Sequence, residues 1–125
     1  RDDENKVRLN FGEFGLASLK AHRHACAAMA QSGVNLILDE VVLSKDMAED
    51  WVAVLDTTDV FWVGVHCDLE ELSRREIARG DRIHGQARGQ FDIVHKHLKY
   101  DFEIDTSQSS PSVCAAEIIK TFASR

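Results

Sequence analysis

The sequence has few cysteines and no long hydrophobic run. Its cysteines, Cys26, Cys67 and Cys114, are odd in number, far apart and form no CxxC pair. This spacing argues against a metal cluster or a disulfide framework, and reduced, buried thiols are the simpler interpretation. No apolar stretch approaches the roughly 20 residues that cross a membrane, and charged residues 1–6 form no signal peptide. We therefore expect a cytoplasmic protein without a membrane partner.

Positive charge is also scarce, because the 125 residues carry a formal net charge of -6. Nonspecific binding of nucleic acid needs an excess of Lys and Arg, so we expect no nucleic-acid partner. The arginines are nevertheless clustered within one segment: Arg74, Arg75, Arg79, Arg82 and Arg88.

Helical and strand-like patterns alternate along the chain. Residues 1–10 read as a loop or frayed end, and residues 11–125 as part of one domain. Helices are expected near residues 11–32, 45–55, 68–78, 88–97 and 111–122. Strands are expected at residues 34–38, 59–67 and 99–105. The alternation predicts an α/β fold with a parallel sheet and helices on both faces, and ligands of such sheets bind beyond the carboxyl ends of the strands.

Four segments carry a resemblance to a known family. Val34–Asp39 has the Walker B form of an apolar run ending in Asp, and Asp68–Ala78 leads into the arginine-rich stretch. With Phe61–Asp68 and Tyr100–Thr106, they resemble the chloramphenicol phosphotransferase family of P-loop kinases. The match also includes Gln90, Val94, His95 and Tyr100-Asp101, so it covers nearly everything from Phe11 onward.

The resemblance implies an ATP-dependent phosphotransferase that acts on a hydroxyl of a small molecule such as chloramphenicol, with ATP and Mg²⁺ as cofactors. Family members also have a GxxxxGK(S/T) loop followed by an aspartate general base, and these 125 residues contain no such loop. We expect this chain to be the C-terminal part of a P-loop kinase-like domain, missing its first strands. The missing strand would pair with the strands ending at Asp39 and Asp68. Another stretch of polypeptide or another chain must then complete the sheet, and this chain alone should neither fold as a monomer nor be active.

The resemblance also assigns site residues. Asp39 would bind Mg²⁺, directly or through water, with Glu40 either sharing this role or facing solvent. The family's lid arginines correspond to Arg79 and Arg82, which would cover ATP and neutralise charge on the transferred phosphoryl group. The alternatives are an Asp that only ends a strand, and a solvated basic face paired with Glu70, Glu71 and Glu76.

The remaining candidates are weaker. Arg75 is a further candidate nucleotide ligand, and so is Thr106, because the loop after the third strand commonly approaches adenine in P-loop kinases; an ordinary polar turn is the alternative. Arg88 is a weaker candidate of the same kind as Arg75, and His66 is expected near the nucleotide side. His22 and His24 could touch the acceptor, although exposed positions on the helix are the simpler interpretation. Arg74 is expected to be solvated, His95 to be a structural hydrogen-bonding residue, and Trp51 and Trp62 to be packing residues.

Two other functions fit the same sequence. A degenerate nucleotide-binding domain without catalysis would serve as an interaction module. A nucleoside or nucleotide kinase of the same superfamily would share the lid arginines and the Walker B strand.

Overall fold

The computed structural model describes residues 6–81 and 83–125, which divide into two compact units. The sheet unit contains residues 6–8, 61–92 except 82, and 98–125. The helical unit contains residues 9–60 and 93–97. Each unit is described below by itself.

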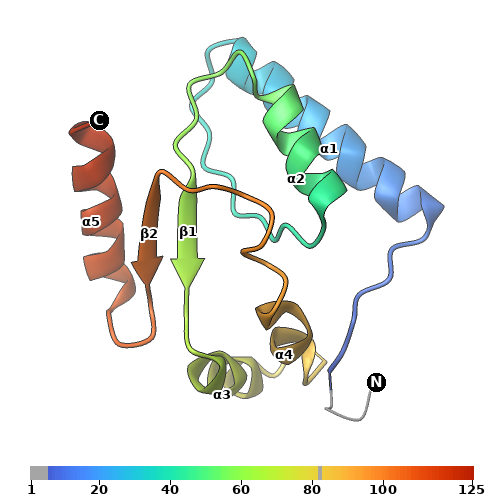
Figure 1. Cartoon of the computed structure of the whole chain (residues 1–125), viewed down its shortest axis with the longest axis vertical. Helices are drawn as coiled ribbons and strands as arrows, with labels where there is room; N and C mark the ends of the chain where they lie inside the picture. The colour runs from blue at the N-terminus through green and yellow to red at the C-terminus, as the bar shows by residue number, and fades with distance from the viewer. Residues whose placement is uncertain (1–5, 82) are drawn as a thin grey trace. The chain divides into compact units, whose positions relative to one another are not determined.

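The elements make a mixed α/β structure (Figure 1). The helices are α1 Glu13–Gln31, α2 Lys45–Val54, α3 Leu69–Arg79, α4 Gln86–Phe91 and α5 Pro111–Ala123. The strands are β1 Val63–His66 and β2 Phe102–Asp105. None of the helices within the described residues is both long enough and apolar enough to traverse a bilayer.

The sheet unit is built on the parallel pair of β1 and β2, whose register aligns Val63 with Phe102 and His66 with Asp105. Figure 1 shows the two strands side by side and pointing the same way, with α5 along β2 and α3 beyond their carboxyl ends. The ring of Tyr100 covers Gly64 so closely that a Cβ there would lie 2.6 Å from its Cδ2 atom. A glycine in the strand therefore makes room for the tyrosine ring.

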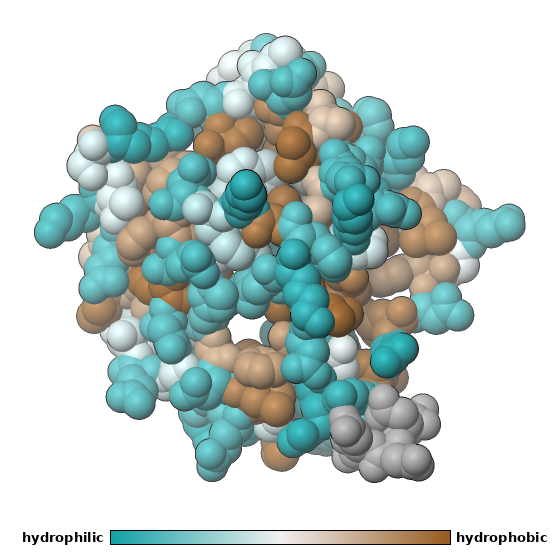
Figure 2. Space-filling view, viewed as in Figure 1, coloured by the Kyte–Doolittle hydropathy of each residue, from teal (hydrophilic) through white to brown (hydrophobic). Residues whose placement is uncertain are grey.

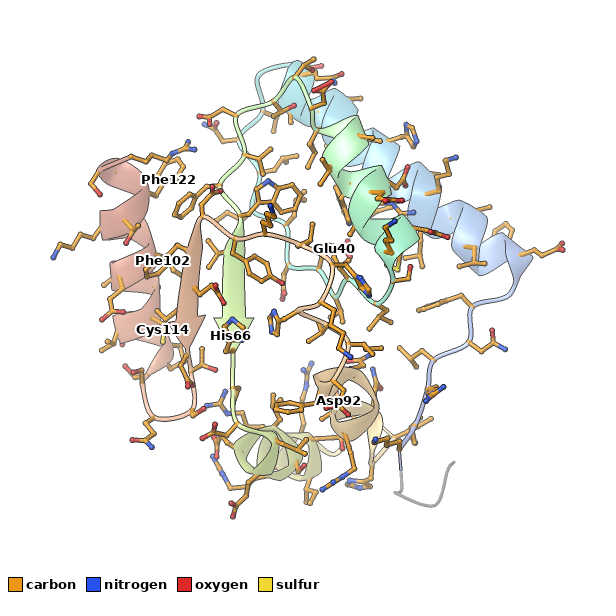
Figure 3. The ribbon with its side chains drawn as sticks, in the orientation of Figure 1. Glu40, His66, Asp92, Phe102, Cys114 and Phe122 are labelled. Atoms are coloured by element: carbon orange, nitrogen blue, oxygen red, sulfur yellow. The ribbon has the colours of Figure 1, made fainter. Side chains whose placement is uncertain are left out.

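Helix α5 covers one side of this sheet. At its start the Ser110 hydroxyl accepts a hydrogen bond from the Val113 amide at 3.4 Å, and Pro111 takes the first helical position. In Figure 3, Cys114 and Phe122 of α5 and Phe102 of β2 lie between the helix and the strand. Cys114 and Ile104 are both buried, so they form part of the core of the sheet unit.

The helical unit is held by packing between α1 and α2. Small and aromatic side chains fill this interface, and they are the buried residues Cys26, Ala27, Ala48 and Trp51. Local residues mark two of the helix ends: Gly33 has a φ of +88° after α1, and the Ser44 hydroxyl accepts a hydrogen bond from the Met47 amide at the start of α2. Buried Arg23 pairs with Asp50 at 2.5 Å, so a charged group inside this unit has its counter-ion.

The strand predicted at residues 34–38 is absent from the described structure, so this prediction is wrong. Residues 34–43 have no regular secondary structure, and Ile37 is fully exposed. A strand needs a neighbouring strand to accept and donate its backbone hydrogen bonds, and among the described residues the sheet consists of β1 and β2 only. Figure 2 shows hydrophobic residues exposed on the visible face of the surface, among hydrophilic ones.

The helix predicted at residues 88–97 is shorter than expected. Helix α4 spans Gln86–Phe91, and the chain then leaves the sheet unit, because residues 93–97 belong to the helical unit. There the Lys96 amide donates to the Ile93 carbonyl at 3.2 Å. These residues are three apart, so the bond closes a tight turn, whereas an α-helical bond joins residues four apart. The hydrophobic spacing of this segment therefore reflects a turn and not a continued helix.

Candidate functional site

The carboxyl ends of β1 and β2 are tied together by the loop after β2. The Thr106 amide donates to the carbonyl of His66 at 2.8 Å, and the Thr106 hydroxyl donates to the same oxygen at 3.0 Å. The next residue, Ser107, accepts a hydrogen bond from the Asp68 amide at 2.8 Å. The edge at which ligands of parallel sheets bind is thus a connected structure and not two separate loops.

Asp105 organises the same loop. Its Oδ1 atom accepts hydrogen bonds from the Ser107 hydroxyl at 2.5 Å and the Ser107 amide at 2.7 Å. These two bonds, the hydroxyl's first, lower the pKa of Asp105, because they stabilise the charged carboxylate. The loop therefore has a fixed negative charge at neutral pH.

Two predicted nucleotide ligands, Arg75 and Thr106, are in contact. The Arg75 guanidinium donates to the Thr106 carbonyl at 2.6 Å and to the Thr106 hydroxyl at 3.2 Å. Its Nε atom donates to Glu71 at 2.7 Å. Arginine has five N–H donors, so two remain beyond these three bonds. Arg75 thus braces the loop after β2 against α3, and nucleotide binding by either residue stays a prediction.

Glu71 is the anion that these arginines share. Arg74 donates to it through Nε and Nη2, both at 2.7 Å, and Arg75 adds a third bond. The bonds from Arg74 and then from Arg75 lower the pKa of Glu71 to about 2. Part of the alternative interpretation, a basic face paired with acidic residues of the same helix, is therefore present at Arg74 and Arg75.

Arg79, one of the two predicted lid arginines, is the last residue of α3. Its Nε atom lies 3.3 Å from a carboxylate oxygen of Asp81, and both side chains are 59% exposed. An ion pair this exposed contributes little, so the guanidinium can exchange Asp81 for another anion at small cost. Gly80 follows in the left-handed conformation and stops the helix. The second predicted lid arginine, Arg82, lies outside the described residues.

Sequence reasoning missed the role of Glu76, which it named only as a possible partner of the arginines. Its two carboxylate oxygens accept hydrogen bonds from the amides of Gly85 and Ala87, each at 2.8 Å. Partial burial of Glu76 opposes ionisation, yet these backbone bonds together lower its pKa. No local pattern predicts these contacts, because they span nine and eleven residues.

His66, at the carboxyl end of β1 (Figure 3), makes a cross-strand contact. Its Nε2 atom lies 2.6 Å from Oε2 of Glu103, and the ring of Tyr100 meets its ring edge to face. Burial, with a smaller contribution from Glu103, raises the pKa of Tyr100. The neighbouring Asp101 accepts from the Trp62 amide at 2.7 Å, so it holds the start of β1.

The helical unit carries the predicted metal ligand. Asp39 is exposed, while Glu40 pairs with His22 of α1 at 3.2 Å. The His22 ring also lies 3.6 Å from the sulfur of buried Cys26 and packs against Trp51, which is buried as predicted. Other candidates are exposed, namely His24 on α1 and Arg88 on α4, and His95 follows α4. The roles proposed for Asp39 and Glu40 stay predictions.

Comparison with known proteins identifies the family. The family model for chloramphenicol phosphotransferase-like proteins matches residues 7–123. Two relatives from Mycobacterium tuberculosis, strains CDC 1551 / Oshkosh and ATCC 25618 / H37Rv, each named "Putative O-phosphotransferase", are 33% identical over 105 residues. These alignments cover 84% of this chain and 47% of each relative, so the chain spans about half the length of these proteins. The chain belongs to the family of chloramphenicol phosphotransferase-like proteins.

Proposed function

We propose that this chain is part of an ATP-dependent phosphotransferase that phosphorylates a hydroxyl of a small molecule. The observation that carries the proposal is the family match, which extends over residues 7–123 and so includes both units. The relatives' names support transfer of a phosphoryl group to oxygen. Chloramphenicol is the first acceptor to test because the family is named for it.

The arginines at the end of α3 would stabilise the phosphoryl group in transfer. Arg79 ends α3 and is paired only with exposed Asp81 among the contacts known for it, so a nucleotide phosphate can replace that carboxylate. Arg82 follows three residues later in the sequence. One planar guanidinium group can donate two parallel hydrogen bonds to phosphate oxygens. It thereby stabilises the negative charge on the phosphoryl group during transfer. Thr106 and the two remaining donors of Arg75 would line the base end of the nucleotide.

Asp39 would bind the magnesium ion that accompanies ATP. Mg²⁺ takes oxygen ligands and keeps several waters, so a single exposed carboxylate is a suitable protein ligand. When bound, the ion would neutralise phosphate charge. Glu40 is already engaged by His22 at 3.2 Å, which makes Asp39 the better ligand of the two.

A partner strand from polypeptide outside this chain would complete the sheet. The Trp62 and His66 carbonyls accept from the β2 side, so the intervening backbone groups of Val63 and Val65 point to the opposite edge of β1. Val65 is 53% exposed. Hydrogen exchange tests this: the Val63 and Val65 amides should exchange rapidly in this chain alone and slowly in the full-length protein. Rapid exchange in both would contradict a strand at this edge.

The activity is tested with the full-length protein, Mg-ATP and a panel of hydroxylated acceptors that includes chloramphenicol. We expect ADP release that depends on the acceptor and falls by roughly 100-fold or more in Arg79→Ala, since charge stabilisation of this kind supplies several kcal/mol. Arg74→Ala is the matched control, because its guanidinium is held by Glu71. Binding of Mg-ATP without ADP release for any acceptor would favour a non-catalytic nucleotide-binding module instead.

A further inference from the structure

We propose that Glu76 is a positioning residue, which fixes the start of α4 against α3, the helix that ends in Arg79. This inference rests on the proposed function, because the arginines matter only if they act on a phosphoryl group. It goes beyond the family resemblance, which assigns no role to this glutamate.

The first step is the geometry of Glu76. One carboxylate accepts from two backbone amides, Gly85 and Ala87, each at 2.8 Å. Hydrogen bonds to an ionised acceptor are stronger than neutral ones, and two on one group fix its orientation. The neighbouring residue Arg75 donates hydrogen bonds to Thr106 in the loop after β2. Two consecutive residues of α3 therefore bond to two different segments of the sheet unit, the loop after β2 and the start of α4.

The second step is the junction at Gly85. Its φ of +97° favours glycine, and both of its backbone groups are engaged. The amide donates to Glu76, while the carbonyl accepts from the amides of Val7 and Gly89 at 2.9 and 3.0 Å. The Val7 carbonyl also comes so close to Gly89 that an added Cβ would lie 2.1 Å from it. The start of α4 is therefore fixed from two directions.

The third step relates this junction to the arginines. Glu76 and Arg79 are three residues apart on α3, and Arg82 precedes Gly85 by three residues in the sequence. The connection begins where Gly80 stops α3 and ends where Glu76 holds Gly85. Anchoring the start of α4 to α3 restricts the conformations open to the end of α3, which lowers the entropy lost when Arg79 takes up its working position.

The test uses Glu76→Gln in the full-length protein, with Glu70→Gln as the control that removes the same charge from an exposed position on the same helix. The side-chain amide of glutamine has one acceptor oxygen, so it can accept from only one of the Gly85 and Ala87 amides, and its NH₂ group would face the other. We expect hydrogen-exchange protection of the Gly85 or Ala87 amide to fall roughly 10-fold or more, and kcat to fall with little change in KM for the acceptor. Glu70→Gln should change neither.

Two results would overturn the inference: unchanged protection of both amides, or lost protection with an unchanged kcat. The failure of the proposed function is recognised separately, because the unmodified protein would then release no ADP with any acceptor. In that case the exchange data alone decide whether Glu76 holds the start of α4, and kcat has no part in the decision.

Discussion

Two β-prone hydrophobic runs of this chain have different structures. In the sheet unit, Val63–His66 pairs with β2, and the ring of Tyr100 covers Gly64. In the helical unit, residues 34–38 have a similar composition, yet Ile37 is fully exposed and no strand forms there among the described residues. The difference teaches that a strand is a property of a pair of segments, because each backbone supplies the hydrogen-bonding partner that the other requires.

The two units also use polar groups differently. In the sheet unit, side chains such as Glu76, Arg75 and Ser107 bond to backbone groups of loops. In the helical unit the central polar contact is an ion pair between two helices, Arg23 and Asp50. The first pattern fixes loops at the predicted ligand edge of the sheet, whereas the second fixes the packing of one helix on another.

The largest expected effect comes from a charge placed in the sheet core. Ile104→Asp puts a carboxylate at a buried position of β2, where water cannot solvate it. We expect a loss of about 4–5 kcal/mol in the free energy of unfolding of the full-length protein, measured by urea denaturation.

Ile37→Asp is the matched change in the other run. We propose that polypeptide outside this chain pairs with residues 34–38 as well, so in the full-length protein this variant should lose about 2 kcal/mol. A change within roughly 0.5 kcal/mol, the usual size for an exposed site, would show that the run stays uncovered and would contradict the completed sheet.

Breaking the helix–helix ion pair should have an effect between those of Ile104→Asp and Ile37→Asp. Arg23→Ala leaves the Asp50 carboxylate, whose side chain is 22% exposed, without its counter-ion. We expect a loss of roughly 3 kcal/mol in the free energy of unfolding. Lys45→Ala removes the exposed pair with Glu49 on α2 and should cost about 0.5 kcal/mol or less. Equal losses in the two variants would show that the buried pair is no more important than the surface pair.

A smaller effect is expected from adding a methyl group under Tyr100. In Gly64→Ala the new Cβ would overlap the tyrosine ring, so the ring must shift, at a cost of about 1–3 kcal/mol. Gly15→Ala on α1 adds the same methyl group where the closest neighbour is 3.4 Å away, and it should be neutral or stabilising. Thermal unfolding of both variants measures the difference, and a neutral Gly64→Ala would refute the close packing.

The smallest effect concerns the loop after β2. In Ser107→Ala the Asp105 carboxylate loses the hydroxyl bond that contributes most to its low pKa, so the pKa should rise toward 3.8. A carboxyl whose pKa is lower in the folded state stabilises the fold at pH values above its unfolded pKa of 3.8. This stabilisation is lost as the pH falls below 3.8 and through the folded pKa. NMR titration of the Asp105 carboxyl measures the shift, with Ser112→Ala on α5 as the control. An unchanged pKa would mean that the amide bond alone sets it.

Local signals in the sequence determined much of the secondary structure. Ser44, Ser110 and Pro111 mark helix starts, and Gly33 and Gly80 mark helix ends, because capping and left-handed backbone depend on adjacent residues only. The family resemblance, carried by the residues around β1, α3 and β2, is confirmed by the match over residues 7–123. Which residues hold the nucleotide and the metal ion stays a prediction.

Only the tertiary structure decided which residues hold the loops and which hydrophobic runs become strands. Glu76 reaches amides nine and eleven residues away, and Arg75 reaches a carbonyl thirty-one residues away, so no periodicity could indicate either contact. Residues 34–38 and the run that contains Val63–His66 are both apolar and β-prone, and only the second has a paired backbone among the described residues. Hydrogen bonds between distant segments depend on how the chain folds back on itself, which local composition does not encode.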